Sequence, residues 1–127
     1  MKKEQKHYHF DWTLARENGP RFENLVACHL LKWVHFQQDS AGRELELRYF
    51  RDVDGREVDF VVTENRKPIL AVECKWQENT LNPALFYFKK RFPQCRVLQI
   101  TAMPGKSFQS PEGIRLMPAV EFLGELT

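Results

Sequence analysis

The chain has 127 residues, of which 43% are hydrophobic and 28% charged, and 19 Lys and Arg against 17 Asp and Glu give a net charge of +2. This length fits a single domain spanning residues 1–127. The composition excludes a disordered chain, which combines low hydrophobicity with high net charge. The apolar runs are short and three scattered cysteines make no disulfide framework or CxxC zinc site, so we expect no membrane span, no signal peptide and a cytoplasmic location.

The first third of the chain predicts a short strand followed by one amphipathic helix. Residues 1–6 are polar and are expected to be disordered. Apolar and polar residues alternate over residues 8–12, which indicates a strand. The sequence Asn18-Gly19-Pro20 combines a stop with a helix start, so the helix is expected from Pro20 to Phe36. Its apolar residues share one face at helical spacing: Phe22, Leu25, Val26, Leu30, Trp33 and Val34.

The middle of the chain predicts three consecutive strands. Alternating apolar and polar residues place them at Leu45–Phe50, Glu57–Thr63 and Ile69–Trp76. Asp52-Val53-Asp54-Gly55 is typical of a hairpin turn between the first two strands. The polar segment Glu64–Pro68 predicts a loop between the second and the third.

The last third predicts a helix, a strand, and a short strand followed by a closing helix. Asn82-Pro83 is a helix cap followed by a first helical position, and the helix is expected to end before Pro93. We expect strands at Arg96–Ala102 and Ile114–Met117, and a helix at Pro118–Leu126. The core order is then α-β-β-β-α-β, which predicts the α/β class, with a mixed sheet flanked by helices.

The pattern of the second and third predicted strands brings two carboxylates together. The apolar residues of Glu57–Thr63 share one face, so Asp59 points to the other, and Glu73 and Lys75 point away from the apolar face of their strand. A hairpin whose apolar faces coincide pairs Val58 with Cys74, Phe60 with Val72 and Val62 with Leu70. The same register places Asp59 directly opposite Glu73.

Two opposed carboxylates need an explanation, because their Cβ atoms would lie about 5 Å apart and like charges repel at that range. A hard divalent ion such as Mg²⁺ between Asp59 and Glu73 is one explanation, since it takes oxygen ligands from one or two carboxylates. Lys75 could then orient or activate a nucleophilic water. The alternative is a structural Glu–Lys–Asp ion-pair cluster on a wet sheet face.

Glu23 is a third candidate acidic residue. It precedes Ala27, Leu30 and Val34 along an apolar stripe, so it is expected on the inward side of its helix, where a carboxylate needs a partner. It could serve as a third ligand or as a general base. The alternative is that Glu23 only complements the positive N-terminal end of the helix dipole.

A basic stretch follows the carboxylates in the sequence. Residues 79–111 contain no Asp or Glu, and their cationic residues are Lys89, Lys90, Arg91, Arg96 and Lys106. Such a stretch suggests contact with a polyanion, and solvated lysines on a helix are the alternative. Because the helix carrying Lys89, Lys90 and Arg91 follows the Glu73 strand closely, we expect it to lie near the carboxylates, as one wall of a nucleic-acid groove.

Together these residues resemble the PD-(D/E)XK nuclease superfamily. An acidic residue on the opening helix, Val58-Asp59 on the second core strand and Glu73-Cys74-Lys75 on the third match its signature, with valine where the superfamily name has proline. The αβββαβ order matches its restriction-endonuclease-like core. The blocks at 21–27, 55–62 and 71–76 are also similar to an uncharacterised domain at the C-terminus of prokaryotic AAA-type ATPases.

The resemblance implies a metal-dependent nuclease, or a nuclease-like domain, that hydrolyses phosphodiester bonds of DNA, with RNA as an open alternative. It implies that Mg²⁺ or Mn²⁺ is held by Asp59, Glu73 and the carbonyl of Cys74, with Lys75 and Glu23 as the other catalytic residues. An AAA-type ATPase and a second copy of the chain are the other expected partners. The competing interpretation is a catalytically inactive module that binds nucleic acid or protein beside such an ATPase.

Overall fold

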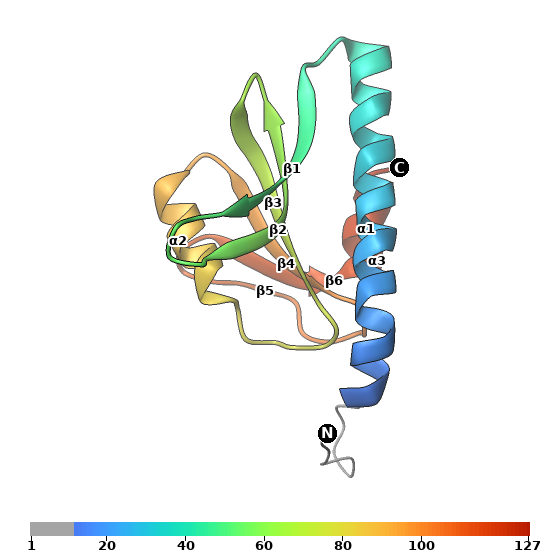
Figure 1. The fold of residues 1–127 in the computed structure, drawn as a ribbon, viewed down its shortest axis with the longest axis vertical. Coiled ribbons are helices and arrows are strands. Elements are labelled where there is room, and N and C mark those ends of the chain that lie inside the picture. The colour runs from blue at the N-terminus through green and yellow to red at the C-terminus, as the bar shows by residue number, and fades with distance from the viewer. Residues whose placement is uncertain (1–11) are drawn as a thin grey trace.

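The long helix α1 runs along the whole molecule (Figure 1). The computed structural model describes the backbone of residues 12–127 and the side chains from residue 18 onward. The expected disorder of residues 1–6 and most of the strand predicted at 8–12 lie outside the described residues. The last residue of that predicted strand, Trp12, begins α1. Helix α1 spans Trp12–Ala41 and contains Pro20. The expected start at Pro20 is therefore wrong, because a proline weakens a helix at this point without forbidding it.

The C-terminal end of α1 also lies beyond the expected Phe36. The hydroxyl of Ser40 donates to the carbonyl of Phe36, and the amide of Gly42 donates to the carbonyl of Gln38. Gly42 then has a φ of 65°, a conformation that glycine adopts without steric cost, and the helix ends there.

Six strands form one mixed sheet in the order β1-β2-β3-β4-β6-β5. The pairs β1–β2 and β2–β3 are antiparallel, and the pairs β3–β4 and β4–β6 are parallel. The edge strand β5, which the sequence did not predict, pairs antiparallel with β6. Their bounds are β1 Leu45–Arg51, β2 Glu57–Glu64, β3 Lys67–Lys75, β4 Arg96–Thr101, β5 Phe108–Gln109 and β6 Ile114–Pro118.

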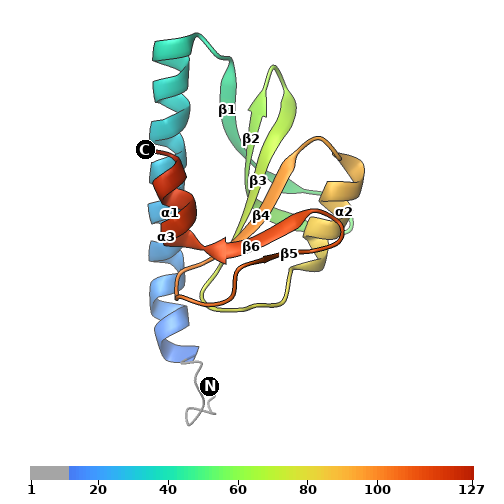
Figure 2. The same cartoon turned by 180° about the vertical axis from the view of Figure 1, so that it is seen from behind.

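Helices cover both faces of the sheet, so the predicted α/β class with flanking helices is confirmed. Helix α1 and helix α3 (Ala119–Glu125) lie on one face, and helix α2 (Pro83–Arg91) lies on the other (Figures 1 and 2). None of the helices in the described part of the chain is long and apolar enough to cross a membrane.

The β2–β3 hairpin closes in a two-residue turn, which is shorter than the loop expected at Glu64–Pro68. Asn65 and Arg66 have φ values of 52° and 71°, as a tight hairpin turn with two left-handed residues requires. Glu64 pairs with Lys67 directly beside the turn. Asn65 is a residue type that favours this conformation, whereas Arg66 carries no such signal.

A β-bulge on β2 changes the expected packing. Arg48 pairs with Val61 and Phe50 pairs with Val58, so the single residue Tyr49 on β1 faces two residues, Asp59 and Phe60, on β2. The extra residue reverses the alternation, and Val58 packs on the α2 side of the sheet while Phe60 packs on the α1 side. The expected shared face of Val58 and Cys74 is therefore wrong, whereas the pairs Phe60–Val72 and Val62–Leu70 are confirmed.

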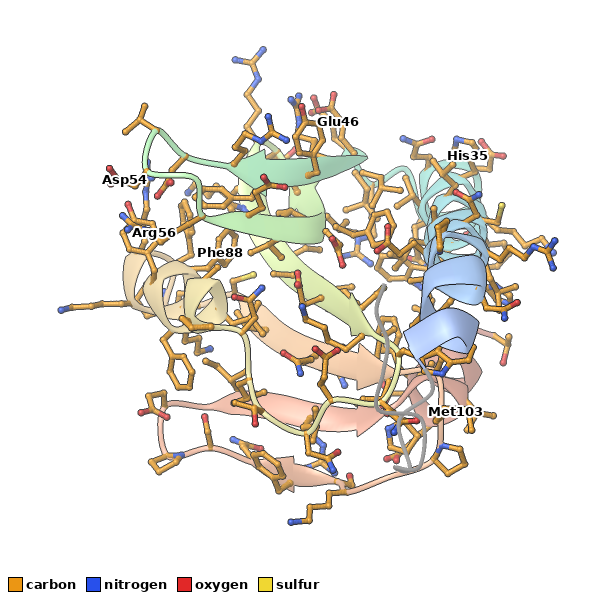
Figure 3. All side chains as sticks on the ribbon, turned by 60° about the horizontal axis from the view of Figure 1, so that its bottom comes forward. His35, Glu46, Asp54, Arg56, Phe88 and Met103 are labelled. Carbon is orange, nitrogen blue, oxygen red and sulfur yellow. The ribbon has the colours of Figure 1, made fainter. Side chains whose placement is uncertain are left out.

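The tip of the β1–β2 hairpin lies against α2. Figure 3 shows Asp54 and Arg56 beside this helix, near Phe88. The Arg56 guanidinium lies 3.8 Å from the centre of the Tyr87 ring and pairs with Asp52 and Asp54. These contacts hold the hairpin onto the α2 face.

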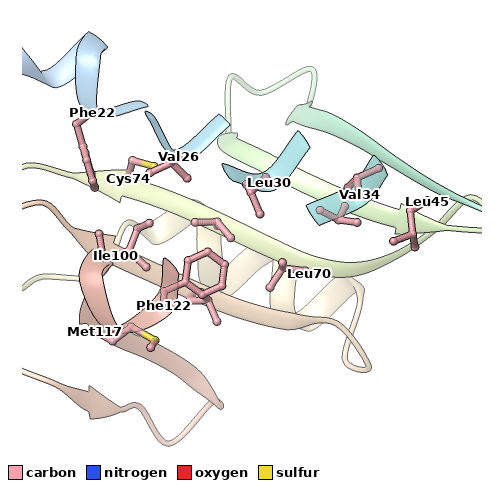
Figure 4. Close-up of a cluster of buried hydrophobic side chains, with 14 residues drawn as sticks. Phe22, Val26, Leu30, Val34, Leu45, Leu70, Cys74, Ile100, Met117 and Phe122 are labelled. Carbon is pink, nitrogen blue, oxygen red and sulfur yellow. The ribbon is translucent and has the colours of Figure 1, made fainter. Parts of the chain in front are cut away.

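The larger hydrophobic core lies between α1, α3 and the sheet (Figure 4). Phe22, Val26, Leu30 and Val34 follow one another at four-residue spacing along the buried face of α1. They pack with residues of the sheet and with α3, including Leu70, Cys74, Ile100, Met117 and Phe122. A second cluster, with Leu85 and Phe88 of α2, fills the other face. The two cores hold β2 and β3 between them.

Candidate functional site

The strands β2 and β3 separate at the end of the hairpin that lies away from its turn, and two carboxylates fill the gap. The last paired residues at this end are Phe60 and Val72. Beyond them, the Asp59 amide donates to Glu73 Oε1 at 3.2 Å, and the Cys74 amide donates to Asp59 Oδ2 at 2.9 Å. Asp59 and Glu73 are thus cross-strand neighbours, as predicted, but they are joined by side-chain hydrogen bonds and not as a directly opposed pair of the ladder. Each carboxylate accepts a hydrogen bond from the backbone of the other strand.

Glu73 is the most enclosed charge of the site, with 7% of its side chain exposed. Its Oε2 accepts a hydrogen bond from Asn82 Nδ2 at 2.8 Å and lies 3.6 Å from Lys75 Nζ. Burial, together with repulsion from Asp59, raises the pKa of Glu73, and the contacts with Asn82 and Lys75 offset only part of that rise. The hydrogen bonds orient this carboxylate without neutralising it.

Asp59 lies half-buried in the bulge of β2. Burial raises its pKa, while the hydrogen bond from the Cys74 amide and the positive charge of Lys75 act in the opposite direction. A bulge turns a side chain away from the direction that regular alternation would give it. The bulge therefore places the Asp59 carboxylate at the gap between the strands, within the influence of Glu23, Glu73 and Lys75.

Glu23 faces Asp59 from α1 but is exposed, so the expected inward position is wrong. The buried stripe of α1 follows Phe22 and Val26, and Glu23 lies one residue, or about 100°, off that stripe. Glu23 and Asp59 line one cavity of about 380 Å³. Partial burial and the charge of Asp59 raise the pKa of Glu23. The structure thus brings the four predicted catalytic residues together from one helix and two strands.

Two polar residues, the half-buried Asn82 and the buried Gln99, position this site without having been predicted to do so. Asn82 caps α2 through its Oδ1, which accepts from the Ala84 amide at 3.0 Å, and its Nδ2 binds Glu73. Gln99 is fully buried, and its Oε1 accepts from the Asn82 amide at 2.9 Å while its Nε2 donates to the Thr80 carbonyl at 3.0 Å. The sequence signals were the cap at Asn82 and a single polar residue within the apolar strand 97–100.

The donor atoms at the gap are hard oxygens of the kind that Mg²⁺ and Mn²⁺ bind. The Cys74 amide points toward Asp59, and because the N–H and C=O of a strand residue point to the same side, the Cys74 carbonyl also points into the gap. Among residues 18–127, no group of three or more His, Cys, Asp or Glu side chains is arranged to hold a metal ion. The carboxylates of Asp59 and Glu73 are two side-chain oxygen donors, so an ion bound here would have to complete its coordination with a carbonyl, water or phosphate, as Mg²⁺ does in sites with one or two carboxylates.

The structure separates most of the basic residues from the carboxylates, so their expected position near the site is wrong. Helix α2 begins at Pro83, directly after the cap Asn82 that binds Glu73. It leads back to the start of β4, which runs parallel to β3, so its basic end lies away from the carboxylates. Arg96 pairs with Leu70, about 16 Å from Lys75 along the strand at about 3.3 Å per residue. Lys89 donates to the carbonyls of Pro93 and Cys95, and Arg96 forms an ion pair with Glu125.

Lys106 differs from the other basic residues of this stretch. It lies in the loop that follows β4, and β4 ends at Thr101, which pairs with Lys75. The neighbouring Gly105 closely approaches the side chain of Asn79, in the segment that leads to Asn82. Lys106 is therefore at the same end of the sheet as the carboxylates.

Comparison with known families places the chain in one of them. The family described as "Domain of unknown function (DUF4143)" matches residues 18–120, which include Glu23, Asp59, Glu73 and Lys75. The chain belongs to the DUF4143 family. No curated protein and no solved structure matched it. The expected membership of an uncharacterised domain family is confirmed, and the DUF4143 match covers the entire sheet together with α2 and most of α1.

Proposed function

We propose that this DUF4143 domain is a metal-dependent nuclease of the PD-(D/E)XK type that hydrolyses phosphodiester bonds of DNA. The observation that carries the proposal is the gap between β2 and β3, where Asp59 and Glu73 replace the strand ladder and Lys75 lies beside Glu73. The order α1-β1-β2-β3-α2-β4 is the αβββαβ order of that superfamily. Fold alone does not establish activity, so the site carries the argument.

The charge balance at the gap favours a bound cation over a structural ion-pair cluster. The carboxylates of Glu23, Asp59 and Glu73 face one ammonium group, that of Lys75. Burial is the main cause that raises the pKa of all three, and repulsion between carboxylates adds to it. Glu64, by contrast, has its own guanidinium partner in Arg43, which lowers its pKa. A divalent ion would supply the missing positive charge.

Each residue then has a distinct role. Asp59, Glu73 and the Cys74 carbonyl would hold Mg²⁺ or Mn²⁺, which when bound polarises the scissile phosphate and acidifies a water molecule. Lys75 positions the attacking water and stabilises the charge that develops on the phosphoryl group. Glu23, across the cavity from Asp59, accepts a proton from that water or adds a further oxygen ligand.

Thermal melts with and without Mn²⁺ test the proposal. The ion should raise the melting temperature of the wild type, because it binds the folded state preferentially. Asp59→Asn keeps an oxygen that accepts from the Cys74 amide but removes a ligand charge, so the apo variant should be as stable as the wild type or slightly more stable, without a metal shift.

Incubation with single-stranded, duplex and branched DNA, with and without the metal, then tests cleavage itself. Metal-dependent cleavage by the wild type and its loss in Asp59→Asn are expected. If millimolar Mn²⁺ neither shifts the wild-type melt nor supports cleavage, the site is a nuclease-like scaffold, and the alternative of an inactive interaction module replaces the proposal.

We also propose that an AAA-type ATPase accompanies this domain, because the sequence blocks that match the DUF4143 domain resemble those found beside such ATPases. The 127 residues contain no Gly-rich phosphate-binding loop, so the ATPase would be a separate domain or protein. Cleavage that depends on ATP when the two are combined would support this partner, and cleavage that is indifferent to the ATPase would argue against it.

A further inference from the structure

The cavity that contains Asp59 and Glu23 has an aromatic side that the proposed chemistry does not use. Its other lining residues are Leu47, Arg48, Tyr49 and Phe60. The cavity volume is about 380 Å³, near the lower end of the range of about 300–1,000 Å³ for small-molecule sites. The lining thus combines two carboxylates and one guanidinium with aromatic and aliphatic side chains.

Tyr49 is unusually available for a tyrosine on a strand. It is 69% exposed, and it is the single β1 residue that faces the Asp59–Phe60 bulge. In the part of the chain that the structure describes, no ring or guanidinium stacks on it. Tyr87, by contrast, is covered by the Arg56 guanidinium. The bulge that positions Asp59 therefore also places a bare aromatic ring beside it.

The chemistry of the cavity selects an uncharged ring as its occupant. Glu23 is not among the proposed principal ligands of the ion, and its charge disfavours a second phosphate group in the cavity, whereas a nucleobase carries no charge and can stack on Tyr49. Arg48 lies at the rim, and its ion pair with Glu46 is well exposed, so it can exchange that partner for a backbone phosphate at little cost. A cavity of about 380 Å³ is large enough for one base, and only an unpaired base can leave its stack to enter it.

We propose that this cavity binds the base of an unpaired nucleotide, stacked on Tyr49, next to the phosphate held at Asp59 and Glu73. The inference rests on the proposed nuclease function and defines its substrate class: the strand is single-stranded, or locally unpaired, at the position that enters the site. Tyr49 is then a residue that determines substrate structure, while Asp59, Glu73 and Lys75 act on the phosphate.

The test measures binding of a single-stranded oligonucleotide that carries one 2-aminopurine, whose fluorescence reports stacking, and of the same sequence as a duplex. The Asp59→Asn variant in EDTA is the parent, so no cleavage interferes. Adding Tyr49→Ala should weaken single-strand binding about 5- to 150-fold, the range expected from the loss of one stacked base, and should relieve the fluorescence quenching. Tyr49→Phe should retain both.

Phe36→Ala is the matched control, because Phe36 is 63% exposed on α1 and does not line the cavity. It should leave binding unchanged, and duplex binding should not respond to Tyr49→Ala. Equal single-strand affinity with and without the Tyr49 ring, or an equal loss on the duplex, overturns the inference.

The two proposals fail separately. If the wild type shows a metal shift and cleavage but Tyr49→Ala binds single strands normally, the substrate assignment is wrong and the nuclease stands. If Tyr49→Ala weakens single-strand binding while the wild type shows no metal shift and no cleavage, the base-binding cavity stands and the nuclease proposal is wrong.

Discussion

The acidic residues at the two ends of the β2–β3 hairpin have different hydrogen-bond partners and opposite pKa shifts. At the turn, Glu64 pairs with Lys67 in the strand ladder, and its carboxylate receives two hydrogen bonds from the Arg43 guanidinium, at 3.0 Å and 2.9 Å. These bonds lower the pKa of Glu64. At the open end, Asp59 and Glu73 accept hydrogen bonds from backbone amides, and their pKa values are raised.

The difference shows what distinguishes a structural carboxylate from a candidate catalytic one. Glu64 has a dedicated cation in a two-point contact, which satisfies its charge within the fold. Asp59 and Glu73 have their orientation fixed but share a single ammonium group with each other. Carboxylates that are held in a fixed orientation but keep an unbalanced negative charge are the kind expected to bind a further positive charge.

Removing Lys75 should have the largest effect, and it should fall on catalysis alone. Lys75→Ala should lower the cleavage rate by at least about 10²-fold, the order of magnitude for the loss of one group that acts in the transition state. The Mn²⁺-dependent shift in melting temperature should remain, since the carboxylates are intact. Single-turnover cleavage and thermal melts measure the two quantities, and loss of the metal shift in this variant would assign Lys75 to metal-site structure instead.

Asn82 joins α2 to the open end, and its removal should cost stability. Asn82→Ala loses the cap on the Ala84 amide and the hydrogen bond to Glu73, so the free energy of unfolding should fall by about 1–2 kcal/mol. Denaturant unfolding measures this change.

Asn82→Asp separates the two contributions of Asn82. It keeps an oxygen that can cap α2 but replaces the amide that donates to Glu73 with a carboxylate, which repels Glu73 in addition to Asp59. Its deficit at pH 7 should therefore shrink as the pH is lowered and Glu73 takes up a proton. A deficit that does not depend on pH would show that the contact with Glu73 contributes nothing.

The pH dependence of stability should have opposite signs at the two ends of the hairpin. Glu64 has a lowered pKa, so its ionised form stabilises the fold at pH 7, and this contribution is lost as the pH falls below the usual pKa of 4.5. Glu64→Gln should therefore be less stable than the wild type at pH 7, and the difference in stability should disappear in acid. Asp59 has a raised pKa, so its ionised form is destabilising at pH 7. In EDTA, Asp59→Asn should be the more stable protein at pH 7, and its advantage should vanish as the pH falls toward 3.8. Two variants with the same sign of pH dependence would contradict the comparison.

The smallest effect is expected at the basic end of α2. The double variant Lys90→Glu, Arg91→Glu should weaken DNA binding, because it removes two positive charges that attract the DNA backbone over a distance. The salt dependence of binding should fall by up to about two released counterions, and the single-turnover rate should not change. Lys89 is left intact because its ammonium binds the carbonyls of Pro93 and Cys95. A changed cleavage rate would show that this end of α2 reaches the chemistry after all, and unchanged affinity and salt slope would remove it from the nucleic-acid surface.

Local patterns predicted most of the elements because each carries its own signal. Alternation located β2 and β3 and the register of Phe60 with Val72, and the Asn82-Pro83 pair located the start of α2. The Asp59–Phe60 bulge could not be predicted in this way, because an extra residue in one strand is visible only against its partner strand.

The roles of buried polar residues depend on contacts between segments that are distant in the sequence. In the sequence, Gln99 is simply a polar residue within an apolar strand. Its role is visible only in the structure, where its side chain accepts a hydrogen bond from the Asn82 amide. The predicted position of the basic residues is wrong because a connection between two segments fixes only the beginning of the second. The start of α2 lies near Glu73, whereas the basic residues are at the other end of the helix. Sequence reasoning thus found the four charged residues of the site and missed the residues that orient them.

The side chain of Gln99 has a consequence for the motions of the molecule. It lies in the interior of β4 and binds both the Thr80 carbonyl and the Asn82 amide, so it fastens a connecting segment to the centre of the sheet. Surface loops normally open on their own, well below the free energy of global unfolding. The Asn82 amide should instead exchange its hydrogen as slowly as amides within the sheet, and the Asn82 side chain that orients Glu73 would then be held in place before any ligand arrives.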